Sequence, residues 1–135
     1  MTLITKIRKI LVPYKEIHLA YLYGSRAKNT HRSTSDVDIG ILLGDLSAYH
    51  SLYPYELGYE VQTILPDPLN VDIRVLNHRP IRFLYRVIRD GKIILCRDED
   101  QRITFETSIT KAWLDIQPLD DQYTSMIEKR ILASP

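Results

Sequence analysis

One short apolar segment that ends in a glycine and a serine, separated by ten residues from two closely spaced aspartates, constrains this chain most strongly. The segment, residues 17–23, is apolar and aromatic apart from one histidine, and it predicts a buried strand that delivers Gly24 and Ser25 at its end. The two aspartates open a second predicted strand, residues 36–43. Because side chains alternate along a strand, both carboxylates should share one face while valine and isoleucines occupy the other.

These residue types suit a site for a nucleotide and a metal. Asp36 and Asp38 offer paired oxygen ligands, which Mg²⁺ prefers. Gly24 lets the backbone approach a phosphate closely, and the hydroxyl and backbone N–H groups of Ser25 can donate hydrogen bonds. Nucleotidyl transfer requires mainly positioning and charge neutralisation, which two metal ions about 3.5–4 Å apart provide. We therefore expect the turn to grip phosphates and the aspartates to hold metal.

A third carboxylate and two basic side chains extend this predicted site. Asp72 belongs to a third predicted strand, residues 70–76, and lies on the face opposite the valine and isoleucine side chains. Three converging carboxylates would raise one another's pKa values unless cations were bound. Arg26 and Lys28 follow the glycine-serine turn and can add positive charge, with arginine able to contact a phosphate through two hydrogen bonds.

The charge is unevenly distributed along the chain. Residues 1–35 carry seven Lys or Arg and one Glu, residues 36–73 carry seven Asp or Glu and no Lys or Arg, and residues 74–92 carry six Lys or Arg and one Asp. The net charge of +1 gives no overall case for direct nucleic-acid binding. An acidic centre between basic flanks suits a cation site with phosphate-binding edges, although a solvated surface is the better explanation of any single charge.

The remaining pattern predicts helices interleaved with strands. We expect a helix before Pro13, a helical turn at residues 26–29, an irregular stretch at 30–35, and a helix within 46–64 that kinks at Pro54 or begins near it. After a stop at 66–68, we expect a helix that starts at Pro80 and ends before Gly91, a strand at 92–96, and two tail helices separated by Pro118. The fold class is therefore α+β, with a mixed sheet of about four strands flanked by helices. We expect one domain over residues 1–135, with a catalytic core at about 1–96 and a helical tail at about 98–133.

The composition and hydropathy of the chain indicate the cellular compartment to expect. The 44% of hydrophobic residues suffices for a core, and one cysteine requires no oxidising compartment. The sequence has neither the pattern of a signal peptide nor an apolar run of roughly 18 residues. We expect a cytoplasmic protein without a membrane span.

The spacing of Gly24-Ser25 and Asp36-x-Asp38 resembles that of the DNA polymerase beta-like nucleotidyltransferase superfamily, and the small size resembles its minimal nucleotidyltransferase branch of MntA-type antitoxins. The resemblance implies Gly24 and Ser25 as phosphate binders, Asp36 and Asp38 as metal ligands, and Asp72 as the third carboxylate. It also implies ATP as substrate and Mg²⁺, as two ions, as cofactor. The implied reaction transfers AMP to a tyrosine of a HEPN-domain, HepT-like ribonuclease toxin, with which the chain would form a hetero-oligomer.

Two residues depart from the pattern of the family. Asn29 stands where many relatives have a glycine four residues after the serine, and His31 replaces a small residue. Asparagine adopts the left-handed conformation more readily than most residues, so the loop can survive. Arg26 and His31 also match the Arg-x4-His spacing of HEPN ribonucleases, which we interpret as coincidence because it falls inside the predicted phosphate loop.

Other functions remain open. A stand-alone nucleotidyltransferase acting on a small molecule such as an antibiotic would use the same motif, whereas a glycosyltransferase using Asp-x-Asp would need a longer chain. A non-catalytic antitoxin could neutralise its partner by occlusion. Nine tyrosines could supply such an interface, and the densest group is Tyr49, Tyr53, Tyr55 and Tyr59. About half of them are expected in the core.

Overall fold

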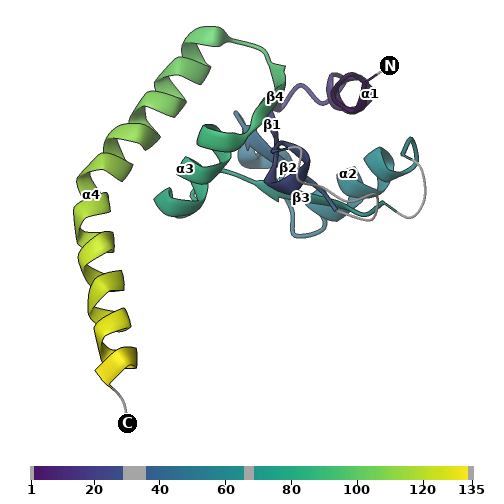
Figure 1. Ribbon diagram of the computed structural model, residues 1–135. Coiled ribbons are helices and arrows are strands. Elements are labelled where there is room, and N and C mark those ends of the chain that lie inside the picture. The colour runs from purple at the N-terminus through teal and green to yellow at the C-terminus, as the bar shows by residue number, and fades with distance from the viewer. Residues whose placement is uncertain (1, 29–35, 66–68, 134–135) are drawn as a thin grey trace.

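A four-stranded sheet lies between two groups of helices in the computed structural model, which describes residues 2–28, 36–65 and 69–133 (Figure 1). The elements are α1 (Leu3–Leu11), β1 (Ile17–Tyr23), the 3₁₀ turn η1 (Gly24–Arg26), β2 (Val37–Leu43), the 3₁₀ turn η2 (Leu46–Ala48), α2 (Tyr53–Gln62), β3 (Val71–Val75), α3 (Ile81–Asp90), β4 (Lys92–Cys96) and α4 (Glu99–Ala133). The predicted stretches at 30–35 and 66–68, with Asn29 and His31, lie outside the described residues.

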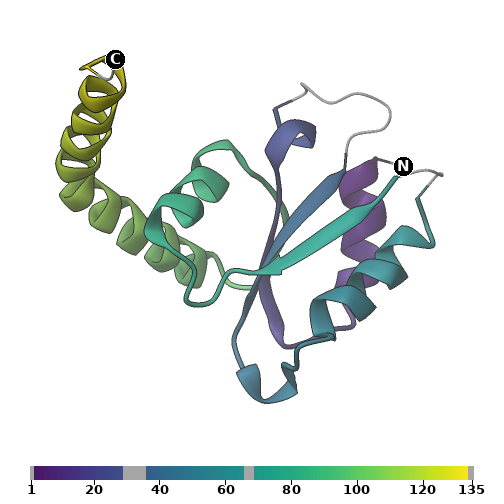
Figure 2. The same cartoon turned by 90° about the horizontal axis from the view of Figure 1, so that it is seen from below.

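The strands form one sheet in the order β3-β2-β1-β4. β1 is antiparallel to β2 and to β4, whereas β2 and β3 are parallel and are joined through α2. This arrangement confirms the predicted mixed sheet of four strands and the α+β class. It leaves β3 at one edge of the sheet, and Figure 2 shows β3 along the near edge, beside α2.

Alternation along the strands divides the core into two layers. Val37, Ile39 and Ile41 of β2 are fully buried in the cluster that includes α1 and α2, as the predicted apolar face requires. Each such side chain stabilises the fold by about 1.5–3 kcal/mol through removal from water. On the opposite face, α3 and the first half of α4 bury Leu84 and Ile109. The face that carries Asp38 is therefore the one covered by α3.

The helix after β2 begins near its proline. α2 starts at Tyr53 with Pro54 in the first turn, where a missing N–H removes no helical hydrogen bond. Of the two predicted alternatives, a kink and a start, the start is correct. Tyr53 is buried and donates a hydrogen bond to Glu16 at 2.8 Å, whereas Tyr55 and Tyr59 are exposed. Burial also raises the pKa of Tyr53.

One local prediction is displaced and another is wrong. The helical turn expected at residues 26–29 begins two residues earlier, as a 3₁₀ turn at Gly24–Arg26, because a glycine with φ of +73° lets the chain turn directly after β1. Pro118 does not separate two tail helices, since it lies inside the continuous helix α4. The proline removes one backbone hydrogen bond, but this part of α4 is exposed and water can solvate the freed carbonyl.

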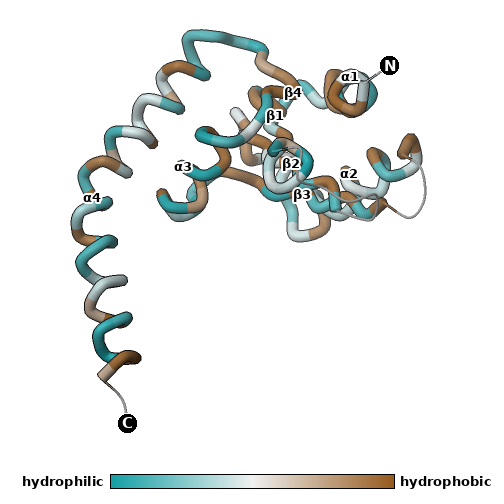
Figure 3. The backbone as a smooth tube through the Cα atoms, in the orientation of Figure 1, coloured by the Kyte–Doolittle hydropathy of each residue, from teal (hydrophilic) through white to brown (hydrophobic). Residues whose placement is uncertain are grey.

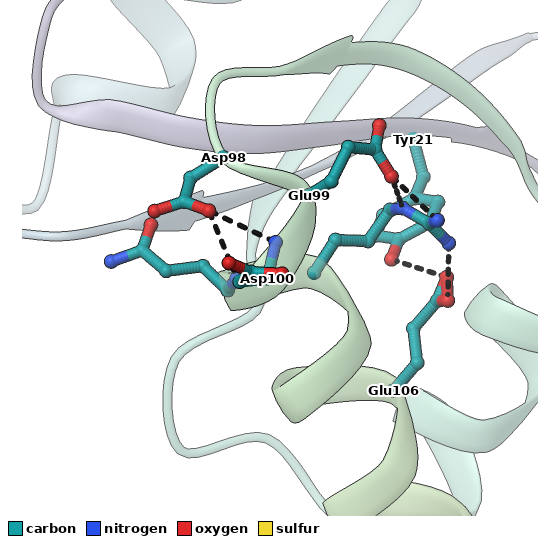
Figure 4. A network of polar contacts seen from close by, with 7 residues as sticks. Tyr21, Asp98, Glu99, Asp100 and Glu106 are labelled. Carbon is teal, nitrogen blue, oxygen red and sulfur yellow. Dashed lines mark hydrogen bonds and ion pairs between the residues drawn. The ribbon is translucent and has the colours of Figure 1, made fainter.

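A polar network fixes the start of α4 against β1 (Figure 4). Asp98 accepts hydrogen bonds from the backbone N–H groups of Asp100 and Gln101, at 2.9 and 3.3 Å, and so caps the helix. Glu106 accepts hydrogen bonds from Tyr21 of β1 at 3.0 Å and from Arg102 at 2.9 Å. Beyond this region α4 runs away from the sheet to the C-terminus (Figure 1).

No helix within residues 2–28, 36–65 and 69–133 combines the length and the apolar character needed to cross a bilayer.

Candidate active site

The sheet register gathers the predicted turn and two of the predicted carboxylates at one end of the sheet. Tyr23, the last residue of β1, pairs with Asp38 of β2, and Asp38 pairs with Asp72 of β3. Asp36 precedes β2 and is exposed. Because Asp38 and Asp72 are register partners on parallel strands, their side chains project from the same face. The third strand thus lies beside the second, a pairing that the sequence had left open and that the position of Asp72 along its strand supported.

The glycine of the turn is required by its contact with Asp38. Gly24 has a φ of +73°, a conformation that side chains disfavour. A Cβ atom built there would lie 2.5 Å from Oδ2 of Asp38, far inside van der Waals contact. The backbone of the predicted phosphate turn therefore lies directly against a carboxylate of the site. Ser25 and Arg26 follow in η1, whose next residues return hydrogen bonds to the Gly24 carbonyl.

Electrostatics couple the three aspartates. Burial raises the pKa of Asp38 above its usual value, and the negative charges of Asp72 and then Asp36 raise it further. Arg74 opposes these effects and lies with its Nε atom 3.3 Å from Oδ2 of Asp72. Within the described parts of the chain, no three His, Cys, Asp or Glu side chains are already gathered as ligands of a metal. The carboxylates nevertheless fit a cation, since its charge would relieve their repulsion.

A cavity of about 540 Å³ opens from this turn toward α3. Its lining residues are Tyr23, Gly24, Lys28, Arg74, Phe83, Arg86, Val87, Arg89 and Asp90. We call it the α3 cavity. Four basic side chains and one acidic side chain give it a positive character suited to phosphates. Ser25 and Arg26 are not among its described lining residues.

Lys28 reaches this cavity but already has a partner. Its Nζ atom lies 3.3 Å from Asp90, the last residue of α3. Asp90 also accepts hydrogen bonds from Arg89, and these bonds, followed by the contact with Lys28, lower the pKa of Asp90 to about 2. Lys28 is thus placed near Gly24, held by an exposed ion pair of the kind that contributes little stability.

Aromatic packing positions Arg74 between the strands and α3. The rings of Tyr23 and Phe83 meet edge to face with centroids 5.7 Å apart, and the guanidinium carbon of Arg74 lies 5.6 Å from the Phe83 centroid. The Tyr23 hydroxyl is buried and has no hydrogen-bond partner among the described residues. Burial raises the pKa of Tyr23 to about 12, so this phenol remains neutral near pH 7.

The sequence interpretation did not select Arg74, Arg86 or Arg89 as site residues. Arg74 could have been found because it alternates with Asp72 on the same strand face. Arg86 and Arg89 are three residues apart on a helix and so share a face. The sequence alone did not show that this helix packs over the face of the sheet that carries the aspartates.

A second cavity of about 440 Å³ lies at the opposite end of the sheet, between His18, Gly44 and the start of α4. It is lined by none of the predicted site residues. This second cavity is smaller than the α3 cavity and lies away from the aspartates.

The fold agrees with the comparison against known families. Residues 5–100 match the family described as "Polymerase beta, Nucleotidyltransferase". That match spans more than half of the chain, which therefore belongs to the polymerase beta nucleotidyltransferase family.

Several solved structures resemble this chain in fold. A crystal structure described as a toxin-antitoxin with AMP-PNP matches with a TM-score of 0.73 and 23% identity, covering 95% of this chain and 98% of that chain. A second match is the complex of a tri-AMPylated Shewanella oneidensis HEPN toxin with an MNT antitoxin, with a TM-score of 0.68, 22% identity and 96% of each chain covered. The toxin-antitoxin MntA-HepT matches with a TM-score of 0.67 and 22% identity, covering 96% of this chain and 97% of that chain. No curated protein sequence matches the chain.

Proposed function

We propose that this protein is a Mg²⁺-dependent nucleotidyltransferase that transfers AMP from ATP to a tyrosine hydroxyl of a HEPN-domain toxin, and so acts as its antitoxin in a hetero-oligomeric complex. The observation that carries the proposal is the register pair Asp38 and Asp72 beside the Gly24 turn, next to a basic cavity. The likeness in fold to complexes described as an AMPylated HEPN toxin with an MNT antitoxin supports the choice of acceptor. We place the reaction in the cytoplasm.

The metal would be held by the three aspartates. Asp36, Asp38 and Asp72 would provide oxygen ligands, with water and the phosphates of ATP completing the coordination. Bound Mg²⁺, as two ions, would supply charge neutralisation for the phosphates during transfer. The raised pKa of Asp38 supports this assignment, because a carboxylate held next to other carboxylates gains most from a cation.

The turn and the α3 cavity would hold the phosphates. Gly24 permits close backbone approach, and Ser25, Arg26 and Lys28 would donate hydrogen bonds to phosphate oxygens. Lys28 would exchange its exposed contact with Asp90 for a phosphate, a small cost because exposed ion pairs contribute about 0–1 kcal/mol. The acceptor oxygen would then bond to the α-phosphorus while pyrophosphate leaves and the hydroxyl loses its proton.

One observation favours a second function, neutralisation by occlusion without transfer. The part of α4 that extends from the sheet exposes apolar side chains at helical spacing: Ile116, Leu119, Tyr123, Met126, Ile127 and Ile131. Figure 3 shows hydrophobic positions recurring along this helix. Such an exposed stripe suits a protein interface. The two functions are compatible, but only transfer requires the aspartates.

A labelling experiment tests the proposal. The protein is incubated with Mg²⁺, ATP labelled at the α-phosphate and a candidate HEPN-domain partner protein. Label should appear on a tyrosine of the HEPN protein, and Asp36→Asn or Asp38→Asn should remove it. Unchanged labelling by both variants would exclude the metal assignment. Neutralisation of the toxin without label would instead establish occlusion, and label on a small-molecule acceptor alone would establish a metabolite enzyme.

A further inference from the structure

A groove separate from the α3 cavity also borders the candidate active site, and Arg74 lines both. It has a volume of about 550 Å³ and wraps the outer edge of β3, between that strand and α2. Its lining residues are Tyr49, Ser51, Pro54, Tyr55, Gly58, Tyr59, Gln62, Val71, Asp72, Ile73, Arg74 and Arg79. We call it the β3 groove. Since it contains residues from both faces of β3, it follows the edge of the sheet rather than one face.

The backbone of β3 leaves hydrogen-bonding groups on this edge. The carbonyl of Asn70 accepts from Val37 and the amide of Leu76 donates to Ile41, so the even-numbered positions point toward β2. Peptide groups alternate sides along a strand, and the amide and carbonyl of Ile73 therefore point away from β2. β3 pairs only with β2 among the described strands. The outward carbonyl of Val75 already accepts a hydrogen bond from Nε of Arg79 at 2.9 Å, so the open part of the edge is centred on Ile73. An edge of this kind is a template for another extended segment.

The wall of the groove is aromatic and accessible. Tyr55 and Tyr59 are 75% and 73% exposed and lie one helical turn apart on α2. α2 lies close to β3 at Gly58, where a Cβ atom would meet the Val71 carbonyl oxygen at 3.4 Å, an ordinary van der Waals contact. Large exposed tyrosines beside an open strand edge are typical of protein-binding surfaces.

The groove is continuous with the predicted chemistry. Asp72 lines it, and Arg74 lines both the β3 groove and the α3 cavity. A segment lying along β3 would therefore bring a side chain to the aspartates from the side opposite the basic cavity. The groove carries only two basic residues, Arg74 and Arg79, and Arg74 already faces Asp72, so its charge does not match a polyphosphate or nucleic acid.

We propose that the β3 groove binds an extended segment of the acceptor protein, which adds as a strand to the free edge of β3, packs against Tyr55 and Tyr59, and presents its hydroxyl at Asp72. The proposal depends on the proposed function only for the identity of the acceptor. A strand rises about 3.3 Å per residue, so the exposed edge of β3 accommodates a segment of several residues rather than a small molecule.

Steady-state transfer to the HEPN protein tests the aromatic wall. The double variant Tyr55→Ala with Tyr59→Ala should raise KM for the acceptor protein by about tenfold or more, as expected for the loss of central aromatic contacts. The kcat and the affinity for ATP should change less than about twofold. Ile103→Ala, which truncates an apolar side chain that is 52% exposed near the start of α4 and lines neither the β3 groove nor the α3 cavity, is the control and should leave the acceptor KM unchanged. An unchanged KM in the double variant would overturn the proposal.

Amide exchange tests the strand edge without requiring catalysis. Adding the HEPN protein should slow exchange of the outward amide of Ile73, whereas the inward amides of Asp72 and Arg74 should change little. Absence of protection at Ile73 in the complex would overturn the groove proposal whether or not transfer occurs. Protection at Ile73 without any labelling would retain the groove and reject adenylyl transfer instead.

Discussion

The two cavities that meet at Arg74 differ in chemistry. The α3 cavity is lined by Lys28, Arg86 and Arg89, whereas the β3 groove is lined by tyrosines and an open strand edge. Phosphates are bound by positive charge, and polypeptide segments by aromatic contact and backbone pairing. From this difference we infer that the site has two sides, with the aspartates between them. The proposed side for ATP, the donor, faces α3, and the proposed side for the acceptor protein faces α2.

Asp38→Asn should have the largest effect, because it acts on the centre shared by both sides. We expect labelling of the acceptor to fall by more than about 100-fold, since losing a ligand costs more than the 10–100-fold typical of the residues that support ligands. Rapid-quench labelling at saturating ATP measures the loss. Glu128→Gln on the exposed end of α4 is a matched removal of one carboxylate and should keep full activity. Retained activity in Asp38→Asn would contradict a catalytic metal site.

Arg74→Ala should damage both sides at once. Arg74 lines both cavities and faces Asp72, so its removal should raise KM for ATP and for the acceptor, each by about three- to tenfold. Arg82→Ala, which breaks an ion pair with Asp120 on α4, is the control and should change neither constant. An effect of Arg74→Ala on only one constant would show that the two cavities do not share this residue in function.

The double variant Arg86→Ala with Arg89→Ala should affect only the donor side. Both residues line the α3 cavity and not the β3 groove, so KM for ATP should rise by about three- to tenfold while KM for the acceptor stays constant. Because the interaction is electrostatic, the difference from wild type should shrink as salt is increased. A rise in the acceptor KM alone would reverse our assignment of the two sides.

The smallest effect concerns stability and pH. The pKa of Asp38 is raised in the folded protein, so its ionisation opposes folding at pH values above that raised pKa. Asp38→Asn should therefore raise Tm at pH 7, without metal, by about 2–4 °C. The gain should decline as pH falls through the raised pKa and vanish below the ordinary pKa of an unfolded aspartate. Differential scanning calorimetry from pH 7 to pH 3 measures it.

Magnesium provides an internal check on that last result. Mg²⁺ should raise Tm of the wild type through binding to the folded state, but it should raise Tm of Asp38→Asn much less. A lower Tm for the metal-free variant at pH 7 would mean that Asp38 is stabilised by its surroundings, contrary to the repulsion we infer.

Much of the fold followed from local patterns. The helix predicted before Pro13 and the strand predicted at 17–23 correspond to α1 and β1, and the helix predicted from Pro80 corresponds to α3, which begins one residue later. Each has an unambiguous period and a proline or glycine at a boundary. Pro118 misled the prediction, since a proline breaks most helices but is tolerated where water can solvate the freed carbonyl. The turn after β1 began earlier than expected because its conformation depends on Gly24 itself.

The candidate site was likewise predictable only in part from the sequence. The sequence by itself determined Gly24, Ser25, Asp36 and Asp38 as a group, because they are close in the chain and strand alternation sets which side chains share a face. Only the tertiary structure decided that β3 lies parallel beside β2, which brings Asp72 to Asp38. It also decided that α3 covers that face and that the outer edge of β3 stays open. Strand order and helix packing join residues far apart in sequence, and no local periodicity encodes which of them become neighbours.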